Sequence, residues 1–145
     1  MDDGNEILIK IIGEIMNPKT EELLNRTFNF GVNCLLFLGK LPKSQEYTII
    51  KFQLAKASTS LGSNYEEAQS VESSRDFIHK IGISAKESRE SNYWLRMLNA
   101  ILAESKKDET FQNILNESYE LKKIFISIKL TAEQNLNDKR NSKKH

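Results

Sequence analysis

The positions of the prolines are the strongest constraint on the fold. Pro18 and Pro42 are the only two, and residues 43–145 contain none. Because proline breaks a helix in its interior, this long proline-free stretch permits long uninterrupted helices. Apolar residues recur through it at spacings of three and four, a pattern typical of amphipathic helices. The sequence therefore predicts an all-α protein.

Four helices with short connections are expected. Each begins at a residue type or pair that favours a helix start. These signals are Asn17 with Pro18, Ser44, the capping box of Ser73 and Asp76, and Asp108. The expected helices cover roughly residues 17–40, 44–69, 73–103 and 108–135. Short connections favour an antiparallel up-down four-helix bundle, so residues 1–145 are expected to form a single domain with its core at about 17–135.

Two further segments flank the expected bundle. Residues 6–16 (EILIKIIGEIM) have apolar side chains at helical spacing, although their isoleucines also suit a strand, and we favour a short extra helix. Residues 136–145 are basic and are expected to form a flexible, disordered tail, with a phosphate-binding arm as the alternative. The net charge of the whole chain is only +1, so no general basic field indicates a nucleic-acid partner.

The first expected helix has apolar side chains on two faces. One stripe consists of Leu24, Phe28, Val32 and Leu35, and the other of Phe30, Cys34, Phe37 and Leu41. Together they cover more than the roughly 100° that a helix needs to face one core. Such a helix is either central in its own domain or buried against a second subunit. We assign Phe30, Cys34 and Phe37 to a subunit interface.

Small residues concentrate in the middle of the second and third expected helices. Gly62 should cost about 1 kcal/mol relative to alanine in a helix interior, and a closely approaching neighbouring backbone would compensate for it. The inward stripe of the third helix is bulky at both ends and small at Ala85, Ser88 and Asn92. We therefore expect the second and third helices to cross closely at their centres.

No catalytic constellation is visible. Metal sites in helix bundles need glutamates with Glu-x-x-His pairs on facing helices. His79 has Asp76 three residues before it, but His145, the other histidine, falls in the tail. We expect no enzymatic activity, no metal and no cofactor. The enzyme alternative is a small hydrolase or metal-dependent oxidase that uses His79 with the glutamates of the third helix.

The sequence also bears on the compartment. Cys34 is the single cysteine, so no intramolecular disulfide can form. The first residues, MDDGNE, are acidic, whereas a signal peptide begins with basic residues. The longest uncharged run, residues 27–39, is too short and too polar to cross a bilayer. We expect a cytoplasmic protein without a membrane partner.

A basic row follows one face of the third expected helix. Its members step by three or four and are Arg75, His79, Gly82, Lys86, Arg89, Tyr93 and Arg96. The row is a solvated face with salt bridges, a polar contact between subunits, or a stripe that tracks phosphates and stacks a base on its aromatic ring. The candidate residues for nucleic-acid binding are Arg75, Lys86, Arg89, Arg96, Lys139, Arg140, Lys143 and Lys144.

The stretch ASTSLGSNYEEA followed by RDFIHKIGISAKESRESNYWLRML carries a family resemblance. It resembles the four-helix-bundle family of proteins encoded in intervening sequences of bacterial large-subunit ribosomal RNA genes, to which the accessory variability determinants of diversity-generating retroelements are related. A weaker match, RTFNFGVNCLLFLGKLPKS, extends the resemblance back to about residue 17, so that it covers residues 17–102. The resemblance implies a homopentameric ring without enzymatic activity. Within the matching segments we assign to the subunit interface Asn64, Glu67, Glu87, Glu90 and Trp94.

These expectations combine into one hypothesis and one alternative. The chain is expected to be a non-enzymatic, pentameric scaffold or adaptor whose partners are further copies of itself and RNA or DNA. The alternative, implied by the retroelement relatives, is an accessory subunit that binds a reverse transcriptase and nucleic acid through a basic surface. The near-neutral charge of this chain favours the scaffold.

Overall fold

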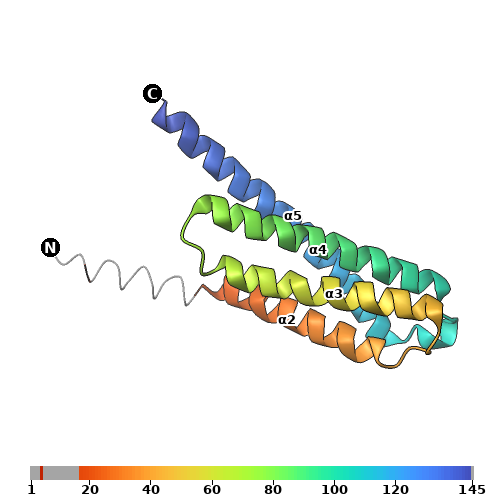
Figure 1. Ribbon diagram of the computed structural model, residues 1–145. Helices are drawn as coiled ribbons and strands as arrows, with labels where there is room; N and C mark the ends of the chain where they lie inside the picture. The colour runs from red at the N-terminus through yellow and green to blue at the C-terminus, as the bar shows by residue number, and fades with distance from the viewer. Residues whose placement is uncertain (1–3, 5–16, 145) are drawn as a thin grey trace.

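The computed structural model describes Gly4 and residues 17–144 and is helical throughout the longer part (Figure 1). The elements are α2 (Pro18–Leu38), α3 (Gln45–Ala68), α4 (Ser74–Ile101), the short 3-10 helix η1 (Glu104–Lys106) and α5 (Glu109–Lys143). The four α-helices run up and down in turn, which confirms the predicted fold class. The short helix expected over residues 6–16 lies outside the described residues.

Local capping explains where three of the four helices begin. The Asn17 side chain accepts hydrogen bonds from the backbone amides of Lys19 and Thr20, at 3.1 and 3.4 Å. Ser73 accepts one from the amide of Asp76 (3.1 Å), and Asp108 accepts one from the amide of Phe111 (2.9 Å). Ser44 also precedes its helix, but its side chain makes no capping hydrogen bond.

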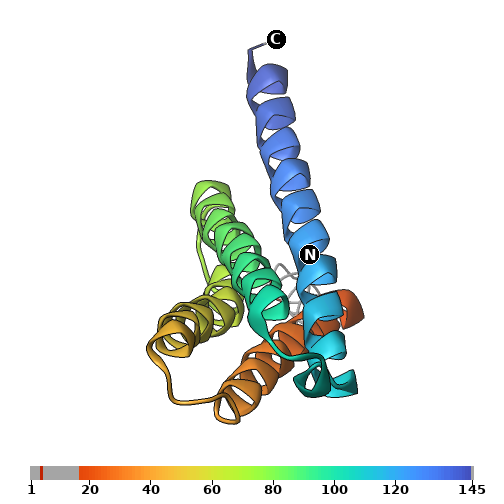
Figure 2. The same ribbon diagram turned by 90° about the vertical axis from the view of Figure 1, so that its right-hand side faces the viewer.

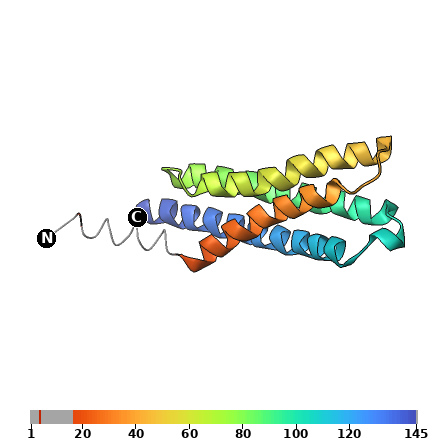
Figure 3. The ribbon, with the colours of Figure 1, turned by 90° about the horizontal axis from the view of Figure 1, so that it is seen from below.

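Consecutive helices are neighbours around the bundle (Figures 2 and 3). α3 packs between α2 and α4, and α4 packs between α3 and α5, whereas α2 contacts α5 less extensively. Fully buried apolar side chains from α3, α4 and α5 fill the centre, and they are Leu54, Leu61, Ile81, Leu95, Leu98, Phe111, Leu121 and Phe125. Phe30, Cys34 and Phe37 of α2 join the same core, which therefore depends on side chains from every helix of the bundle.

Two glycines allow α2 and α3 to approach closely. A Cβ atom on Gly62 would lie 3.3 Å from the backbone of Thr27, and one on Gly31 would lie 3.2 Å from the carbonyl oxygen of Ser58. The close contact expected between the second and third helices of the bundle, α3 and α4, is also present: the Ser84 hydroxyl donates to the Leu61 carbonyl at 3.0 Å. The close backbone neighbour expected for Gly62 is therefore present, and it belongs to α2.

The C-terminal segment differs from the prediction. Instead of a disordered tail from residue 136, α5 continues as a helix to Lys143 and extends past the bundle (blue in Figures 1 and 2). No proline or glycine interrupts α5, and the Gln134 amide donates to the Asp138 carboxylate at 3.0 Å. Arg140 and Lys143 in the last turn also suit the negative end of the helix dipole. The basic residues therefore lie on a helical extension.

Candidate functional site

Two adjoining hollows run between the outer surfaces of α4 and α5. Their volumes are about 680 and 410 Å³, and they share Arg89, Glu90 and Ile126 as lining residues. We call this surface the basic groove and define it by its five cations, Lys86, Arg89, Arg96, Lys122 and Lys129. The up-down topology creates it because α4 and α5 are antiparallel neighbours. A polyanion lying along the two helices would meet cations from both walls.

The basic groove contains three of the predicted nucleic-acid residues, namely Lys86, Arg89 and Arg96. Arg75 is exposed in the first turn of α4, further along the same helix. The predicted tail cations are all exposed on α5 or directly after it, at Lys139, Arg140, Lys143 and Lys144. The structure thus connects the two predicted sets through α5, which forms one wall of the groove.

Sequence analysis missed two cations of the groove, Lys122 and Lys129. Both belong to α5 and therefore fall outside the row that we traced along a single helix. Gly82 of α4 leaves room for the Lys129 side chain. A Cβ atom at Gly82 would meet only that side chain, at 3.9 Å. No local sequence pattern connects these two lysines with the basic row of α4, because only the antiparallel packing of α5 against α4 brings them together.

Most cations of the basic groove are not neutralised within the chain. Lys86 pairs with Glu90 and Lys129 with Glu133, each at 3.9 Å and at partly exposed positions where an ion pair contributes little. Over residues 17–144, Arg89 and Lys122 take part in no ion pair. A salt-bridged face, our first interpretation of this row, therefore describes only part of it.

Arg96 and Tyr93 form a small recognition unit within the groove. The Arg96 Nε donates to the Asn92 side-chain oxygen at 3.0 Å, which fixes the guanidinium beside the helix. The guanidinium carbon lies 5.6 Å from the centre of the Tyr93 ring, a cation–π distance. Tyr93 is itself 45% exposed, so one part of its ring remains accessible to a partner. A positive group beside an exposed aromatic ring is suited to a phosphate with an adjacent base.

A second surface, over α2 and α3, is apolar. Six large side chains are exposed there, and they are Phe28 (70%), Val32 (38%), Leu35 (47%), Leu36 (64%), Ile49 (55%) and Phe52 (66%). We call these six residues the apolar face. A hollow of about 450 Å³ lies between the two helices, with Gly31 and Gly62 among its lining residues. Large apolar side chains that remain exposed on a folded chain are candidates for a protein contact.

The two stripes of α2 have the opposite roles from those predicted. Phe30, Cys34 and Phe37, which we assigned to a subunit interface, are 2%, 0% and 6% exposed and belong to the core of the chain itself. Phe37 packs on Phe111 of α5 with ring centres 5.2 Å apart. Burial also raises the pKa of the Cys34 thiol to about 12, so it stays protonated and unreactive. The exposed stripe is the one that contains Phe28.

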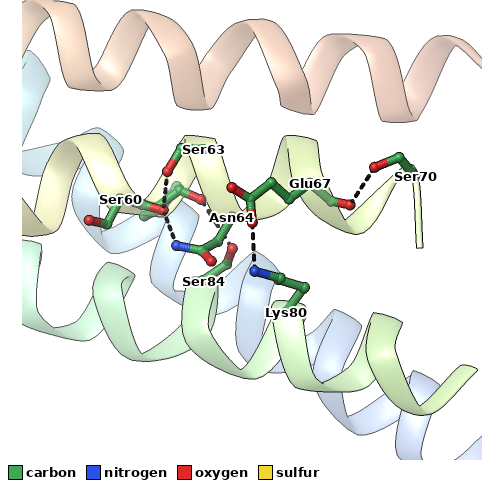
Figure 4. A network of polar contacts seen from close by, with 8 residues as sticks. Ser60, Ser63, Asn64, Glu67, Ser70, Lys80 and Ser84 are labelled. Carbon is green, nitrogen blue, oxygen red and sulfur yellow. Dashed lines mark hydrogen bonds and ion pairs between the residues drawn. The ribbon is translucent and has the colours of Figure 1, made fainter. Parts of the chain in front are cut away.

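Of the five interface residues assigned within the resemblance, three are engaged in the chain's own contacts. The Asn64 amide donates to the Ser60 carbonyl at 2.8 Å, and Glu67 pairs with Lys80 of α4 at 2.5 Å (Figure 4). Trp94 is partly buried against the core and lies edge-on to Tyr93. These contacts stabilise the bundle, and a role between subunits remains a prediction.

Glu87 differs from the other assigned residues because one of its carboxylate oxygens is buried without a hydrogen-bond partner. The residue is 9% exposed, and its Oε2 atom has no accessible surface to bond to water. Burial, followed by repulsion from Glu90, raises the pKa of this carboxyl above its ordinary value. Glu90 is partly exposed and is held only by its long contact with Lys86. Attraction to Lys86 and Lys56 of the same chain opposes this increase in the Glu87 pKa in part.

Two classes of site are absent from the described residues. No group of three or more histidine, cysteine, aspartate and glutamate side chains is arranged there to hold a metal ion. None of the described helices combines the length and the apolar character that a membrane span requires.

The chain matches a family model described as 23S rRNA-intervening sequence protein over residues 19–127. It is also similar to a crystal structure of a protein of unknown function from the S23 ribosomal protein family of Bacteroides thetaiotaomicron. The TM-score is 0.65 and the sequence identity 30%, over 76% of this chain and 96% of that one. No curated protein matches the sequence.

Proposed function

Because the chain belongs to the 23S rRNA-intervening sequence protein family, we propose that it is a non-enzymatic scaffold that assembles from several copies of itself and binds nucleic acid along its outer surface. The observation that carries the self-association is the apolar face. The observation that favours nucleic acid is the basic groove.

The apolar face supports association because its exposure is costly in water. Removing one large apolar side chain from water is worth about 1.5–3 kcal/mol, and six such side chains are exposed on α2 and α3. Part of this gain offsets the loss of rotational and translational freedom on association. Five copies in a closed ring is the number that the resemblance implies.

The mass of the protein in solution tests the scaffold. Sedimentation equilibrium of the full chain at micromolar concentration should give a multiple of 16.7 kDa, with fivefold as the expected value. A mass of one chain across this concentration range would overturn the proposal. A stable multiple other than five would retain the scaffold and correct only the copy number.

Nucleic-acid binding rests on the unpaired cations of the basic groove. A ring would repeat the groove in every copy, and avidity would raise a weak phosphate contact to useful affinity even for a chain with a net charge of +1. Binding through phosphates releases counterions, so the affinity should fall steeply as salt increases. The sequence of the nucleic acid should matter little, because phosphate contacts carry no base information.

Filter binding of labelled RNA and DNA to the full chain at about 50 mM salt, where screening is weak, tests this second function. Retention that decreases with added salt is expected, and no retention of either polymer would overturn it. The same chain would then be a scaffold for another protein. The reverse-transcriptase alternative predicts a basic chain, and the near-neutral charge favours the scaffold over it.

A further inference from the structure

A polar hollow lies between α2 and α5, whose contact is less extensive than that of the other neighbouring helices. Its volume is about 530 Å³, within the roughly 300–1,000 Å³ that is typical of ligand sites. Four asparagines line it, Asn29 and Asn33 on α2 and Asn113 and Asn116 on α5. We call this hollow the asparagine groove. None of its asparagines belongs to the basic groove or to the apolar face.

One ion pair between the two walls fixes how they face each other. The Arg26 guanidinium donates two hydrogen bonds to the Glu117 carboxylate, at 3.1 and 2.5 Å. α2 and α5 run in opposite directions, so the residues after Arg26 face those before Glu117 (Figure 3). Asn29 and Asn33 therefore lie opposite residues 110–116, which include both asparagines of the α5 wall.

The four carboxamides have no partner within the described chain. All four residues are exposed, and none of their side chains forms a hydrogen bond within residues 17–144. Asparagine is also a poor helix former, so the four lower helix stability without a compensating contact. Each carboxamide offers two N–H donors beside a carbonyl acceptor. The groove can therefore donate and accept hydrogen bonds along both walls.

The lining disfavours a nucleic acid. Its charged residues are Arg26, Glu117 and Glu120, so one cation stands against two carboxylates. Nucleobases bind protein surfaces by stacking on aromatic rings, and Phe30, the single aromatic residue of the lining, is only 2% exposed. A phosphate backbone would meet net repulsion, and its bases would find no accessible ring in the lining. The asparagine groove thus fits a different class of ligand from the basic groove.

An extended polypeptide backbone matches the spacing of the carboxamides. Each peptide unit carries one donor and one acceptor, as a carboxamide does. In an extended chain, alternate residues present their backbone groups on the same side, about 6.6 Å apart. Asn29 and Asn33 are separated by about 6 Å along α2, and Asn113 and Asn116 by about 4.5 Å along α5. Backbone groups at both edges of an extended segment would therefore find carboxamide partners.

We propose that the asparagine groove binds an extended peptide segment of another protein, one without acidic side chains. Asn29 and Asn33 hydrogen-bond to one edge of its backbone, and Asn113 and Asn116 to the other. Because main-chain groups are recognised, the extended form of the peptide should matter more than its sequence. The inference goes beyond the proposed function, since it requires neither self-association nor nucleic acid.

Selection from a phage library of short random peptides supplies the probe. The library is first passed over the Asn33→Leu, Asn113→Leu variant of the full chain, which removes peptides that bind other surfaces. It is then selected on the unsubstituted chain, where binders of the asparagine groove should be enriched. Failure to enrich any peptide in this second step would overturn the proposal.

Methylation of the backbone nitrogens of an enriched peptide tests main-chain recognition. Methyl groups at alternate residues remove the donors on one edge, and the affinity should fall about tenfold because several hydrogen bonds are lost together. Fluorescence anisotropy of the labelled peptide measures the affinity. Unchanged affinity after methylation of either edge would overturn the proposal, and this test needs no change in the protein.

A second pair of substitutions locates the peptide on the chain. Asn29→Leu with Asn116→Leu, which the selection does not use, removes one carboxamide from each wall and should also weaken binding about tenfold. Asn25→Leu with Asn137→Leu is the matched control, because both asparagines are exposed on the same two helices but do not line the groove. Circular dichroism should show the same helix content in both variants. Equal affinities of the two variants for the peptide would contradict binding in the asparagine groove.

Discussion

The outer surfaces of the two helix pairs, α2 with α3 and α4 with α5, differ sharply although the pairs share one core. Phe28, Leu36 and Phe52 are each at least 64% exposed over α2 and α3, whereas the corresponding surface of α4 and α5 carries the cations of the basic groove. The inner faces of both pairs pack into the same set of buried side chains. The residues on the two outer surfaces can therefore differ without changing the side chains that form the core.

This difference separates the two proposed contacts. An apolar surface gains free energy when water is excluded, which suits a second protein copy. A cationic surface gains most from counterion release, which suits a polyanion. Substitutions on one surface should therefore leave the contact made by the other intact, apart from the avidity that assembly provides.

The largest effect is expected from placing charge on the apolar face. The double variant Phe28→Asp and Leu36→Asp should dissociate the assembly to single chains, because burying two carboxylates without partners is prohibitively costly. Sedimentation equilibrium measures the mass, and far-ultraviolet circular dichroism should show an unchanged helix content. Leu130→Asp, at a position that is 61% exposed on α5, is the control and should retain the full mass. If it dissociates equally, the difference between the two pairs does not decide assembly.

The next largest effect is expected in the basic groove. Arg89→Glu with Arg96→Glu should lower RNA or DNA retention by a factor of about 10 or more, since both changes replace attraction to phosphate by repulsion. Filter binding measures retention, and sedimentation should show that the mass is unchanged. Lys19→Glu with Lys43→Glu, two exposed positions outside the groove, makes the same change in net charge. Equal losses in both double variants would mean that net charge, and not the groove, controls binding.

A smaller effect is expected at the glycines of the two pairs. Ala at Gly62 places a Cβ atom 3.3 Å from the Thr27 backbone, whereas Ala at Gly82 meets only a flexible lysine side chain at 3.9 Å. Both variants gain the same helix propensity, so the difference in their free energies of unfolding isolates the tight α2–α3 contact. Gly62→Ala should be less stable than Gly82→Ala by about 1–3 kcal/mol in urea denaturation. Equal free energies of unfolding for the two variants would show that α2 and α3 can move apart without loss of stability.

The smallest effect concerns Glu87, at the border between the two pairs. Burial raises the pKa of its carboxyl in the folded chain. Below the ordinary glutamate pKa both states are protonated and the group costs nothing. As the pH rises through the raised value, the charged form is penalised and the free energy of unfolding decreases. In the Phe28→Asp, Leu36→Asp background, where the expected single chains make unfolding simple to measure, Glu87→Gln should flatten this decrease between acid and neutral pH. Identical pH profiles with and without Glu87→Gln would contradict it.

Local signals made the helices predictable, and the bundle itself determined what could not be predicted. Asn17, Ser73 and Asp108 cap their helices as expected, because capping needs only neighbouring residues. The two stripes of α2 have the same spacing, so only their packing against the other helices reveals that the stripe with Phe30 is buried and the one with Phe28 exposed.

The basic groove was likewise predictable only in part. Its α4 cations follow a single helix and are visible as a row in the sequence. Lys122 joins them only because α5 lies antiparallel to α4, and no local pattern contains that information. We did not predict the helical end of α5, because the apolar pattern stops before it. The helix continues there because helix propensity and the Gln134–Asp138 hydrogen bond act within the helix and require no core.

The neighbour-to-neighbour order of the helices also sets a sequence of events during synthesis. α2, α3 and α4 contact one another in the order in which they are made, and the 35 residues of α5 take about 2–7 s more to be added. Until then the buried side chains of α4, among them Leu95 and Leu98, lack the cover that α5 later provides. Asn92, which in the finished chain donates to the Ser118 hydroxyl at 3.0 Å, meanwhile hydrogen-bonds to water. The nascent three-helix chain is thus the form most in need of protection from aggregation.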